Sequence, residues 1–464
     1  MMWSIELRDV PFEADVRELL MAFYPDGADV AVRAECSGSD YMFNVRFGPE
    51  TDGAGSSFLC ARSGNRFDEK CDVKRKLYSV LSSHEGRTLP WGTLTGIRPT
   101  KLAMQGIDFK KTFLTSDEKI KLCFDTAARE QKVLEKTDSE NGWSLYAGIP
   151  FCPTRCLYCS FTAYPITLWK DKKQNYIDAL CREIEAVSEM MSGKKLQTVY
   201  MGGGTPTSLE ADELELILNR IRECNDMSHV LEFTVEAGRP DSITEDKLKA
   251  LKRCGVTRIS VNPQSMNQKT LDLIGRRHTV DDVREKFSLA RSIGFDNINM
   301  DIIAGLPGET AEDVGHTMDE LAELRPDDIT VHSLALKRAA RLSEEKDRYG
   351  SVSFDTMCRM IELTKTRCAQ MDLTPYYLYR QKNMAGNFEN VGYAREGKEG
   401  IYNILIMEEK QTIVGCGAGT TTKIPLNGGL DGVKRIENVK DPQVYIDRID
   451  EMIARKREIN NGTD

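Results

Sequence analysis

Residues 144–159 read SLYAGIPFCPTRCLYC. The run from Ser144 to Ile149 predicts a short apolar strand. Three cysteines, Cys152, Cys156 and Cys159, follow this strand directly and lie within eight residues of one another. The unit of a short strand followed by a loop and an amphipathic segment recurs downstream, and this repetition determines the fold class.

Five further strands alternate with five amphipathic helices after this stretch. The strands are predicted at Gln197 to Met201, Glu232 to Ala237, Arg258 to Val261, Ile298 to Ile303 and Ile329 to Leu334. The helices are predicted at Lys172 to Met191, Ala211 to Cys224, Thr244 to Cys254, Val280 to Ile293 and Ala311 to Leu324. This alternation predicts an α/β fold with a parallel sheet and right-handed crossovers. Six strands favour a partial, open (β/α)6 barrel, and a doubly wound sheet is the alternative.

Distinctive residues of this region follow the strands at their predicted carboxyl ends. The cysteine loop follows the first strand, and Gly202-Gly203-Gly204-Thr205-Pro206 follows the second. Glu236 ends the third strand, Gln264 comes after the fourth, and Asp301 lies in the fifth. Because the loops at the carboxyl ends converge while helices cover the sides, ligands bind there in such folds. The sequence therefore predicts a ligand site at this end of the barrel.

Three further segments flank the predicted barrel domain of residues 143–341. Residues 1–90 carry short alternating apolar runs and a predicted helix, which indicates a small α+β domain. Residues 91–142 begin with a stretch rich in Gly and Pro and continue into a helix, which is typical of a connector. Residues 342–464 contain a helix, an aromatic run and a glycine cluster, and they are predicted to form a C-terminal cap or substrate domain.

Composition and charge narrow the class of protein. The chain has 464 residues and a formal net charge of -9, which argues against a protein that coats nucleic acid. No run approaches the roughly 18 apolar residues of a membrane span, and residues 1–32 lack a secretion signal. The 13 cysteines are odd in number and spread over the chain, unlike a disulfide scaffold. We therefore expect a cytoplasmic protein with reduced thiols and no membrane partner.

The cysteine loop can bind one metal centre, and three chemistries come into question. Structural zinc prefers four ligands, and the nearest further cysteine, Cys181, lies in a predicted helix. A redox pair of Cys156 and Cys159 leaves Cys152 without a role. A [4Fe-4S] cluster bound by three cysteines leaves one iron open for another ligand, and we favour this interpretation. The other ten cysteines are predicted to be unreactive, mostly buried thiols.

The cysteine motif, with Tyr158 before its last member, and the glycine stretch at 202–206 together resemble the radical S-adenosylmethionine (SAM) enzymes. Within that superfamily, YAGIPFC at 146–152 and GGGTPTSL at 202–209 resemble the oxygen-independent coproporphyrinogen III oxidase family. The stretch NMAGNF at 383–388 and the longer N-terminal region are similar to its HemZ-like subgroup. The resemblance implies a [4Fe-4S] cluster whose open iron binds SAM, and reduction of the cluster then produces a radical that removes a substrate hydrogen.

The resemblance also implies roles for individual residues. The cluster ligands, on which catalysis depends, are Cys152, Cys156 and Cys159. The SAM contacts, for one or two SAM molecules, are Tyr146, Tyr158, Gly203, Gly204, Thr205, Glu236, Gln264, Arg276 and Asp301. The alternative for Arg276 is a solvated side chain at the end of a helix. For Asp301, a buried carboxylate needs a partner, which favours a functional role.

The activity that the resemblance implies is the oxidative decarboxylation of two coproporphyrinogen III propionates to vinyl groups, which gives protoporphyrinogen IX for haem biosynthesis. The partners would be the tetrapyrrole and an electron donor such as flavodoxin or ferredoxin. Because the chain is acidic, the cations that bind propionates must be concentrated locally. The candidates are Arg276, Arg277, Lys337, Arg338 and Arg341.

Two departures from the family pattern keep alternatives open. The oxidase usually has a fourth cysteine two residues after the third, where this chain has Phe161. The related haem chaperone usually has a histidine in its C-terminal region, and this chain has none after His332. The alternatives to the oxidase are a chaperone-like protein that binds haem or another tetrapyrrole, and a radical SAM enzyme with another substrate.

Overall fold

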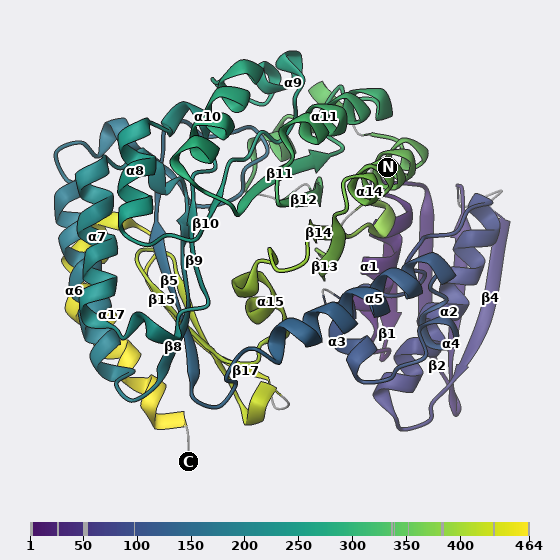
Figure 1. The fold of residues 1–464 in the computed structure, drawn as a ribbon. Coiled ribbons are helices and arrows are strands. Elements are labelled where there is room, and N and C mark those ends of the chain that lie inside the picture. The colour runs from purple at the N-terminus through teal and green to yellow at the C-terminus, as the bar shows by residue number, and fades with distance from the viewer. Residues whose placement is uncertain are drawn as a thin grey trace. The chain divides into compact units, whose positions relative to one another are not determined.

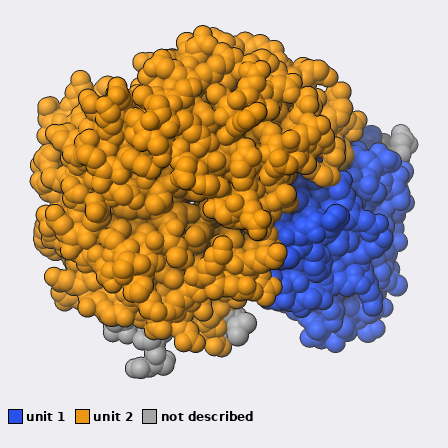
Figure 2. All heavy atoms as spheres, in the orientation of Figure 1, with its two compact units in different colours: residues 1–128, 333–335, 378–390 blue, residues 129–332, 336–377, 391–464 orange. Residues whose placement is uncertain are grey.

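The computed structural model describes residues 3–25, 27–49, 54–96, 98–335, 337, 339–350, 352–381, 385–429 and 432–462. Arg338 and the first two residues of the 383–388 stretch lie outside the described residues. The chain forms two compact units (Figure 2). The first comprises residues 1–128, 333–335 and 378–390, and the second comprises residues 129–332, 336–377 and 391–464.

The first unit contains a four-stranded sheet in the order β1 (Ser4–Arg8), β2 (Val30–Ser37), β3 (Asp40–Phe47) and β4 (Ala54–Ala61). Its helices are α1 (Glu13–Phe23), α2 (Arg66–Glu85), α3 (Pro99–Met104), α4 (Phe109–Phe113) and α5 (Asp117–Leu134), of which the last ends in the second unit. The predicted small α+β domain is confirmed. α1 and β4 were not predicted from the sequence, and most of β4 is exposed and lacks the alternation that identifies a half-buried strand.

Residues 378–390 pack into the first unit through buried polar groups. Glu389 accepts hydrogen bonds from Lys119 Nζ at 2.6 Å and from Trp91 Nε1 at 2.7 Å. Arg380 donates to the carbonyl oxygen of Leu94 at 2.6 Å. Each of these groups is buried, where polar groups need hydrogen-bond partners. The bonds join segments that are far apart in the sequence.

The second unit is built on an eleven-stranded sheet in the order β13-β14-β12-β11-β10-β9-β8-β5-β15-β16-β17. Its six central strands are the predicted ones: β5 (Gly142–Ile149), β8 (Lys195–Gly203), β9 (Glu232–Glu236), β10 (Arg258–Ser260), β11 (Ile298–Ala304) and β12 (Asp328–Ser333). Neighbours from β5 to β11 pair in parallel. The predicted open barrel-type α/β fold is confirmed.

The helices between these strands cover the outer side of the sheet (Figure 1). They are α6 (Lys173–Met190), α7 (Ala211–Cys224), α8 (Glu245–Arg253), α9 (Gln268–Leu273), α10 (Val280–Ile293) and α11 (Ala311–Leu324). Thr279 and Thr310 begin α10 and α11 with capping boxes, which explains why the sequence predicts these starts well. No helix in the described ranges combines the length and the apolar character that a membrane crossing requires.

The C-terminal segment extends the same sheet at both edges. β15 (Thr412–Cys416) pairs in parallel with β5, and β16 (Thr421–Pro425) and β17 (Val433–Glu437) continue from it antiparallel. At the other edge, β14 (Asn390–Ala394) pairs antiparallel with β12, and β13 (Thr374–Tyr379) follows. The remaining helices are α12 (Arg341–Glu344), α13 (Lys346–Tyr349), α14 (Phe354–Gln370), α15 (Ile401–Glu408), α16 (Pro442–Asp447) and α17 (Ile449–Lys456). The four domain boundaries drawn from the sequence stay a prediction, but much of the predicted cap belongs to this sheet.

A buried ion pair fixes the turn after β15. Glu183 on α6 and Lys456 on α17 are both fully buried, and their charged atoms lie 2.7 Å apart. Glu183 also accepts hydrogen bonds from the Tyr445 hydroxyl at 2.6 Å and from the Gly417 backbone N–H at 2.7 Å. The turn after β15, which contains Gly417, is therefore attached to α6 and α17 on the outside of the sheet.

Candidate functional site

The two faces of the central strands differ in chemistry. One face carries buried apolar side chains that pack toward the helices, such as Leu145, Val199, Val235 and Ile302. The other face carries polar groups that bond to one another across strands, such as the Thr198 hydroxyl to Ser144 at 2.7 Å and Tyr200 to Glu236 at 2.6 Å. A polar inner face suits a polar ligand better than the apolar filling of a closed barrel.

The cysteine loop begins in the short strand β6 (Phe151–Cys152), which pairs with β7 (Tyr164–Pro165). The glycine turn after β8 supports it, because the Thr205 backbone N–H donates to the Phe151 carbonyl at 2.7 Å. Cys152 Sγ lies 3.4 Å from the Thr205 hydroxyl. Cys156 is buried, and Cys152 and Cys159 are half-buried free thiols. The structure therefore brings the predicted ligand loop against the predicted glycine turn.

The three thiols of the loop offer the donor atoms that an iron–sulfur cluster uses. In a [4Fe-4S] cluster, each thiolate binds a different iron. Burial raises the pKa of Cys152 to about 11 and also raises that of Cys159. Metal binding would remove these protons, because the thiolate is the ligand form.

The glycines of the turn make room for a carboxylate and for the cysteine loop. A Cβ atom on Gly202 would lie 2.9 Å from Cδ of Glu236, and one on Gly204 would lie 2.4 Å from the Phe151 carbonyl oxygen. Gly203 has a φ of 109°, which L side chains rarely adopt. The three consecutive glycines are therefore required by close approach and backbone conformation.

Three tyrosine rings are stacked beside this turn. The ring centres of Tyr146 and Tyr200 lie 6.0 Å apart, and those of Tyr200 and Tyr402 lie 4.5 Å apart. Tyr402 belongs to α15, which lies on the inner side of the sheet (Figure 1). Glu232 accepts from the first backbone N–H of that helix, on Ile401, at 2.6 Å. Tyr200 and Tyr402 were not predicted as site residues, although the position of Tyr200 two residues before the glycines was a usable signal.

Glu236 at the end of β9 is the carboxylate next to the glycine turn. Burial raises its pKa from 4.5 to about 7, the hydrogen bond from Tyr200 lowers it, and the charge of Asp301 raises it. A carboxyl group with this pKa can change its protonation state near neutral pH. It can therefore accept hydrogen bonds from a ligand once it is ionised.

Replacing Glu236 with glutamine should reduce the loss of stability that occurs as the pH rises from 5 to 8. The folded protein keeps the Glu236 proton up to about pH 7, whereas the unfolded chain releases it near 4.5. The stability from this proton is thus fully present below pH 4.5 and is lost as the pH rises through 7. The total loss of stability reaches about 3 kcal/mol by pH 8, of which about 2 kcal/mol falls between pH 5.5 and pH 8.

Urea unfolding of the metal-free protein at pH 5.5 and pH 8 would measure this effect. Glu245→Gln on the exposed surface of α8 is a matched control, for which the pH dependence should follow the wild type. Equal pH dependence in Glu236→Gln and the wild type would contradict the shifted pKa.

Arg276 and Tyr158 form a second part of the site. Arg276 is buried, so the solvated helix end considered above is wrong. Its guanidinium donates to the Tyr158 hydroxyl at 3.1 Å and to the carbonyl oxygens of Gly238 at 2.7 Å and Asn262 at 2.5 Å. Burial raises the pKa of Tyr158 well above 10, so the phenol stays protonated. Arg276 thus links the cysteine loop to the ends of β9 and β10.

Asp301 on β11 is surrounded by hydrogen-bond donors. Its oxygens accept from Asn262 and from Asn299, each at 2.8 Å, and His332 Nε2 lies 3.8 Å away. Burial alone would raise the pKa of Asp301, but His332 and Asn299 lower it below its ordinary value. A buried carboxylate at Asp301 was expected to need a partner, and the structure provides partners from the protein itself. His332, which lies at the carboxyl end of β12, was not predicted as a site residue.

Gln264 joins this region through its backbone. It has a φ of 67°, its N–H donates to the carbonyl oxygen of Asp301 at 3.0 Å, and its own carbonyl oxygen accepts from Ile303 at 3.0 Å. Its side chain is buried. This left-handed residue continues the pairing between β10 and β11 beyond the end of β10.

The predicted cations are in varied surroundings. Lys337 Nζ lies 5.9 Å from the ring centre of the exposed Phe161, in a cation–π contact. Arg341 lies 3.4 Å from Glu345, and Arg277 is exposed. Arg338 lies outside the described residues. Lys337 is the cation that the structure brings to the residue occupying the fourth-cysteine position.

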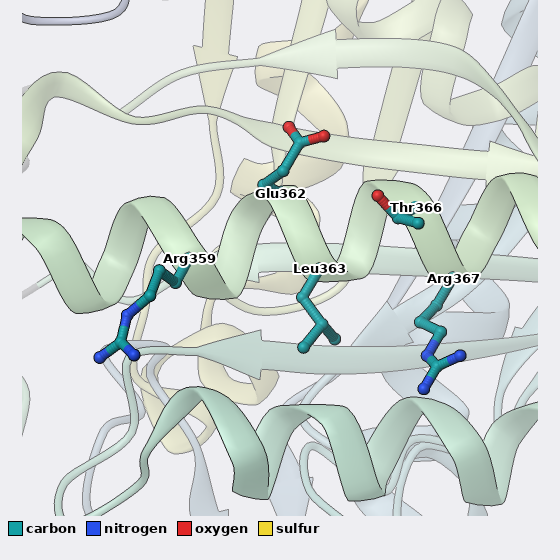
Figure 3. A pocket seen from close by; sticks show the side chains of 5 residues that line it. All are labelled: Arg359, Glu362, Leu363, Thr366 and Arg367. Atoms are coloured by element: carbon teal, nitrogen blue, oxygen red, sulfur yellow. The ribbon is translucent and has the colours of Figure 1, made fainter.

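A separate hollow lies on the outer helix α14. Figure 3 shows that all five labelled side chains come from this one helix, and they are Arg359, Glu362, Leu363, Thr366 and Arg367. None of them is a predicted site residue or a thiol. The candidate site is therefore the region around the cysteine loop and not this hollow.

Comparisons with known proteins match the part of the chain that contains the cysteine loop and the glycine turn. The model of the radical SAM superfamily matches residues 146–321. The oxygen-independent coproporphyrinogen-III oxidase-like protein HemZ of Bacillus subtilis (strain 168) is 41% identical over 393 residues, which are 82% of this chain and 78% of that protein. The chain belongs to the HemZ-like group of the radical SAM superfamily. Membership of the radical SAM superfamily implies a [4Fe-4S] cluster and SAM.

Two other proteins are similar to this HemZ-like chain. The heme chaperone HemW of the same organism is 31% identical over 309 residues, which are 66% of this chain and 76% of that protein. The solved structure of coproporphyrinogen III oxidase (HemN) from Escherichia coli, a radical SAM enzyme, has a TM-score of 0.56 and 22% identity. The matched region covers 70% of this chain and 73% of the chain in that structure. The likeness to HemN supports the fold.

Proposed function

We propose that this chain is a radical SAM enzyme that oxidatively decarboxylates propionates of coproporphyrinogen III to vinyl groups. In this proposal, Cys152, Cys156 and Cys159 bind the [4Fe-4S] cluster. The observation that carries it is the loop of three free thiols against the glycine turn, beside the polar inner face of the barrel. The 41% identity to a coproporphyrinogen-III oxidase-like protein supports the choice of substrate class.

The chain's residues would bind and orient one or two SAM molecules. When bound, the cluster and SAM supply a carbon radical that removes a hydrogen atom from the substrate. Glu236 would accept hydrogen bonds from the ribose or amino group of SAM, and the Gly203 and Gly204 N–H groups would approach its amino acid part. The rings of Tyr146 and Tyr158 would exclude water. Further SAM contacts are proposed for Thr205, Gln264, Arg276 and Asp301.

The substrate and electron partners follow from charge and redox requirements. Lys337, Arg341 and Arg277 would bind propionates, because carboxylates pair well with ammonium and guanidinium groups. Decarboxylation of each propionate releases CO2 and one electron, which passes to a one-electron acceptor. Flavodoxin or ferredoxin would reduce the cluster. The reaction is proposed to occur in the cytoplasm, where thiols stay reduced.

A second candidate is a chaperone-like protein that binds haem or another tetrapyrrole. The 31% identity to a heme chaperone favours it. The presence of Phe161 where the oxidase usually has a fourth cysteine also leaves room for it. Against imidazole ligation of haem by the C-terminal segment, the chain has no histidine after His332.

The deciding experiment uses anaerobically reconstituted full-length protein with SAM, dithionite and coproporphyrinogen III. The oxidase predicts protoporphyrinogen IX and 5′-deoxyadenosine together. Absence of product, together with stoichiometric haem uptake by a parallel sample that receives haem, would favour the chaperone and overturn the oxidase. Formation of 5′-deoxyadenosine only with another molecule would assign a different radical SAM substrate.

Replacing Asp301 with asparagine should spare the cluster and weaken SAM binding. The new amide would place N–H donors opposite those of Asn262 or Asn299, so the group that faces SAM would be reoriented. Loss of a charged hydrogen bond weakens binding by roughly 10- to 100-fold. Iron content and equilibrium SAM binding would measure both effects, with the exposed Asp272→Asn as control. Iron loss, or unchanged SAM affinity, would show that Asp301 is not a SAM contact.

A further inference from the structure

Arg239 has a buried contact with one of the proposed cluster ligands. It follows β9 three residues after Glu236 and is 4% exposed. Its Nη1 donates a hydrogen bond to Cys156 Sγ at 3.3 Å. Arg239 could not be predicted from the sequence, because one arginine in a loop has no distinctive spacing.

The guanidinium of Arg239 is held in place by two other residues. Asp241 accepts from Nε at 2.9 Å and from Nη2 at 2.8 Å in a bidentate pair. Thr154, within the cysteine loop, accepts from Nη2 through its hydroxyl at 3.1 Å and from Nη1 through its carbonyl oxygen at 3.4 Å. The planar fork is thus fixed by oxygen acceptors, while Nη1 also points at the sulfur.

Two other arginines near the loop provide a comparison. Arg155 lies between Cys152 and Cys156 in the sequence, but it is exposed and donates to the carbonyl oxygen of Ala339 at 2.7 Å. Arg276 is buried and donates to oxygen atoms of Tyr158, Gly238 and Asn262. Of these three arginines, Arg239 is the one that donates to a cysteine sulfur of the loop.

We propose that Arg239 is a positioning residue that makes the cluster easier to reduce through its hydrogen bond to Cys156. Reduction adds one negative charge to the cluster and its thiolates, and hydrogen bonds to the sulfurs set the reduction potential. A buried cation stabilises that extra charge more than an exposed cation, because water screens it less. This inference rests on the proposed cluster at Cys152, Cys156 and Cys159.

The test is a redox titration of the reconstituted full-length protein, followed by electron paramagnetic resonance of the reduced cluster. In Arg239→Gln, the ratio of reduced to oxidised cluster at a fixed potential should fall about tenfold. This corresponds to a shift of about 59 mV to more negative potential for a one-electron couple. Arg239→Lys should shift less, because lysine keeps the charge but loses the fork that bonds Asp241 and Cys156 together.

Arg155→Gln is the matched control, since it removes the same charge from the same loop without removing a bond to sulfur. Its potential should stay close to that of the wild type. The inference is overturned if Arg239→Gln binds full iron and shifts no more than Arg155→Gln, or shifts to more positive potential. It is also overturned if Arg239→Gln and Arg239→Lys both lose iron, which would make Arg239 a structural support. A wild type without a cluster would instead overturn the proposed function.

Discussion

Replacing Cys156 with alanine should remove the iron–sulfur cluster from the anaerobically purified protein. Cys156 is one of three free thiols on the loop, and three is the number of cysteines that leave one iron open for SAM. With only two thiolates left, the cluster loses its attachment. The brown absorbance, at about 400 nm for a cubane cluster, should disappear together with the iron.

The control for this variant is Cys368→Ala on α14. Cys368 is buried, as Cys156 is, but lies outside the cysteine loop. It should keep its iron and lose only the stability that a small buried side chain provides. Iron analysis and the visible spectrum of both variants would check the result. Unchanged iron in Cys156→Ala would remove the basis of the proposed function.

Replacing Lys456 with methionine should lower the free energy of unfolding by about 3–5 kcal/mol, because it leaves the Glu183 carboxylate buried without its cation. Lys456 and Glu183 are both 0% exposed and lie 2.7 Å apart. The carboxylate keeps hydrogen bonds from Tyr445 and Gly417, and these do not neutralise its charge. Urea unfolding at pH 7 would measure the change.

Arg182→Met is the comparison for that experiment. Arg182 also lies on α6 and pairs with Asp450 at 2.6 Å, but the two side chains are 54% and 85% exposed. Removing an exposed pair changes stability by about 0–1 kcal/mol. Similar losses in the two variants would contradict the expectation that the buried pair contributes more to stability than the exposed pair.

The barrel could be predicted from the sequence because its signals are local. The predicted limits of α7, α10 and α11 agree with the structure, since their apolar positions repeat with helical spacing. α10 and α11 in addition begin at threonine caps. The cysteine loop, the glycine turn and Glu236 could be placed at strand ends, and Asp301 within a strand, for the same reason. Each of these residues follows, ends or lies in a strand that is visible in the pattern.

Features that depend on contacts between distant segments could not be predicted. The TIVGC sequence of β15 gives no sign that its neighbour is β5, because parallel pairing leaves no mark in either strand alone. Tyr402 joins the stack of tyrosines only because α15 returns to the inner side of the sheet. Arg239 differs from other loop arginines only in what it contacts. Likewise, the structure shows that Arg276 is buried, whereas its neighbours in the sequence suggested a solvated helix end.

The pairing of β15 with β5 has a consequence for biosynthesis. β5 leads into the cysteine loop, whereas β15 comes from residues 412–416, much later in the chain. Until those residues leave the ribosome, one edge of β5 is an unpaired strand on the nascent chain, and such edges promote aggregation. The strand that carries the cysteine loop therefore gains its full pairing only after a distant later segment has been synthesised.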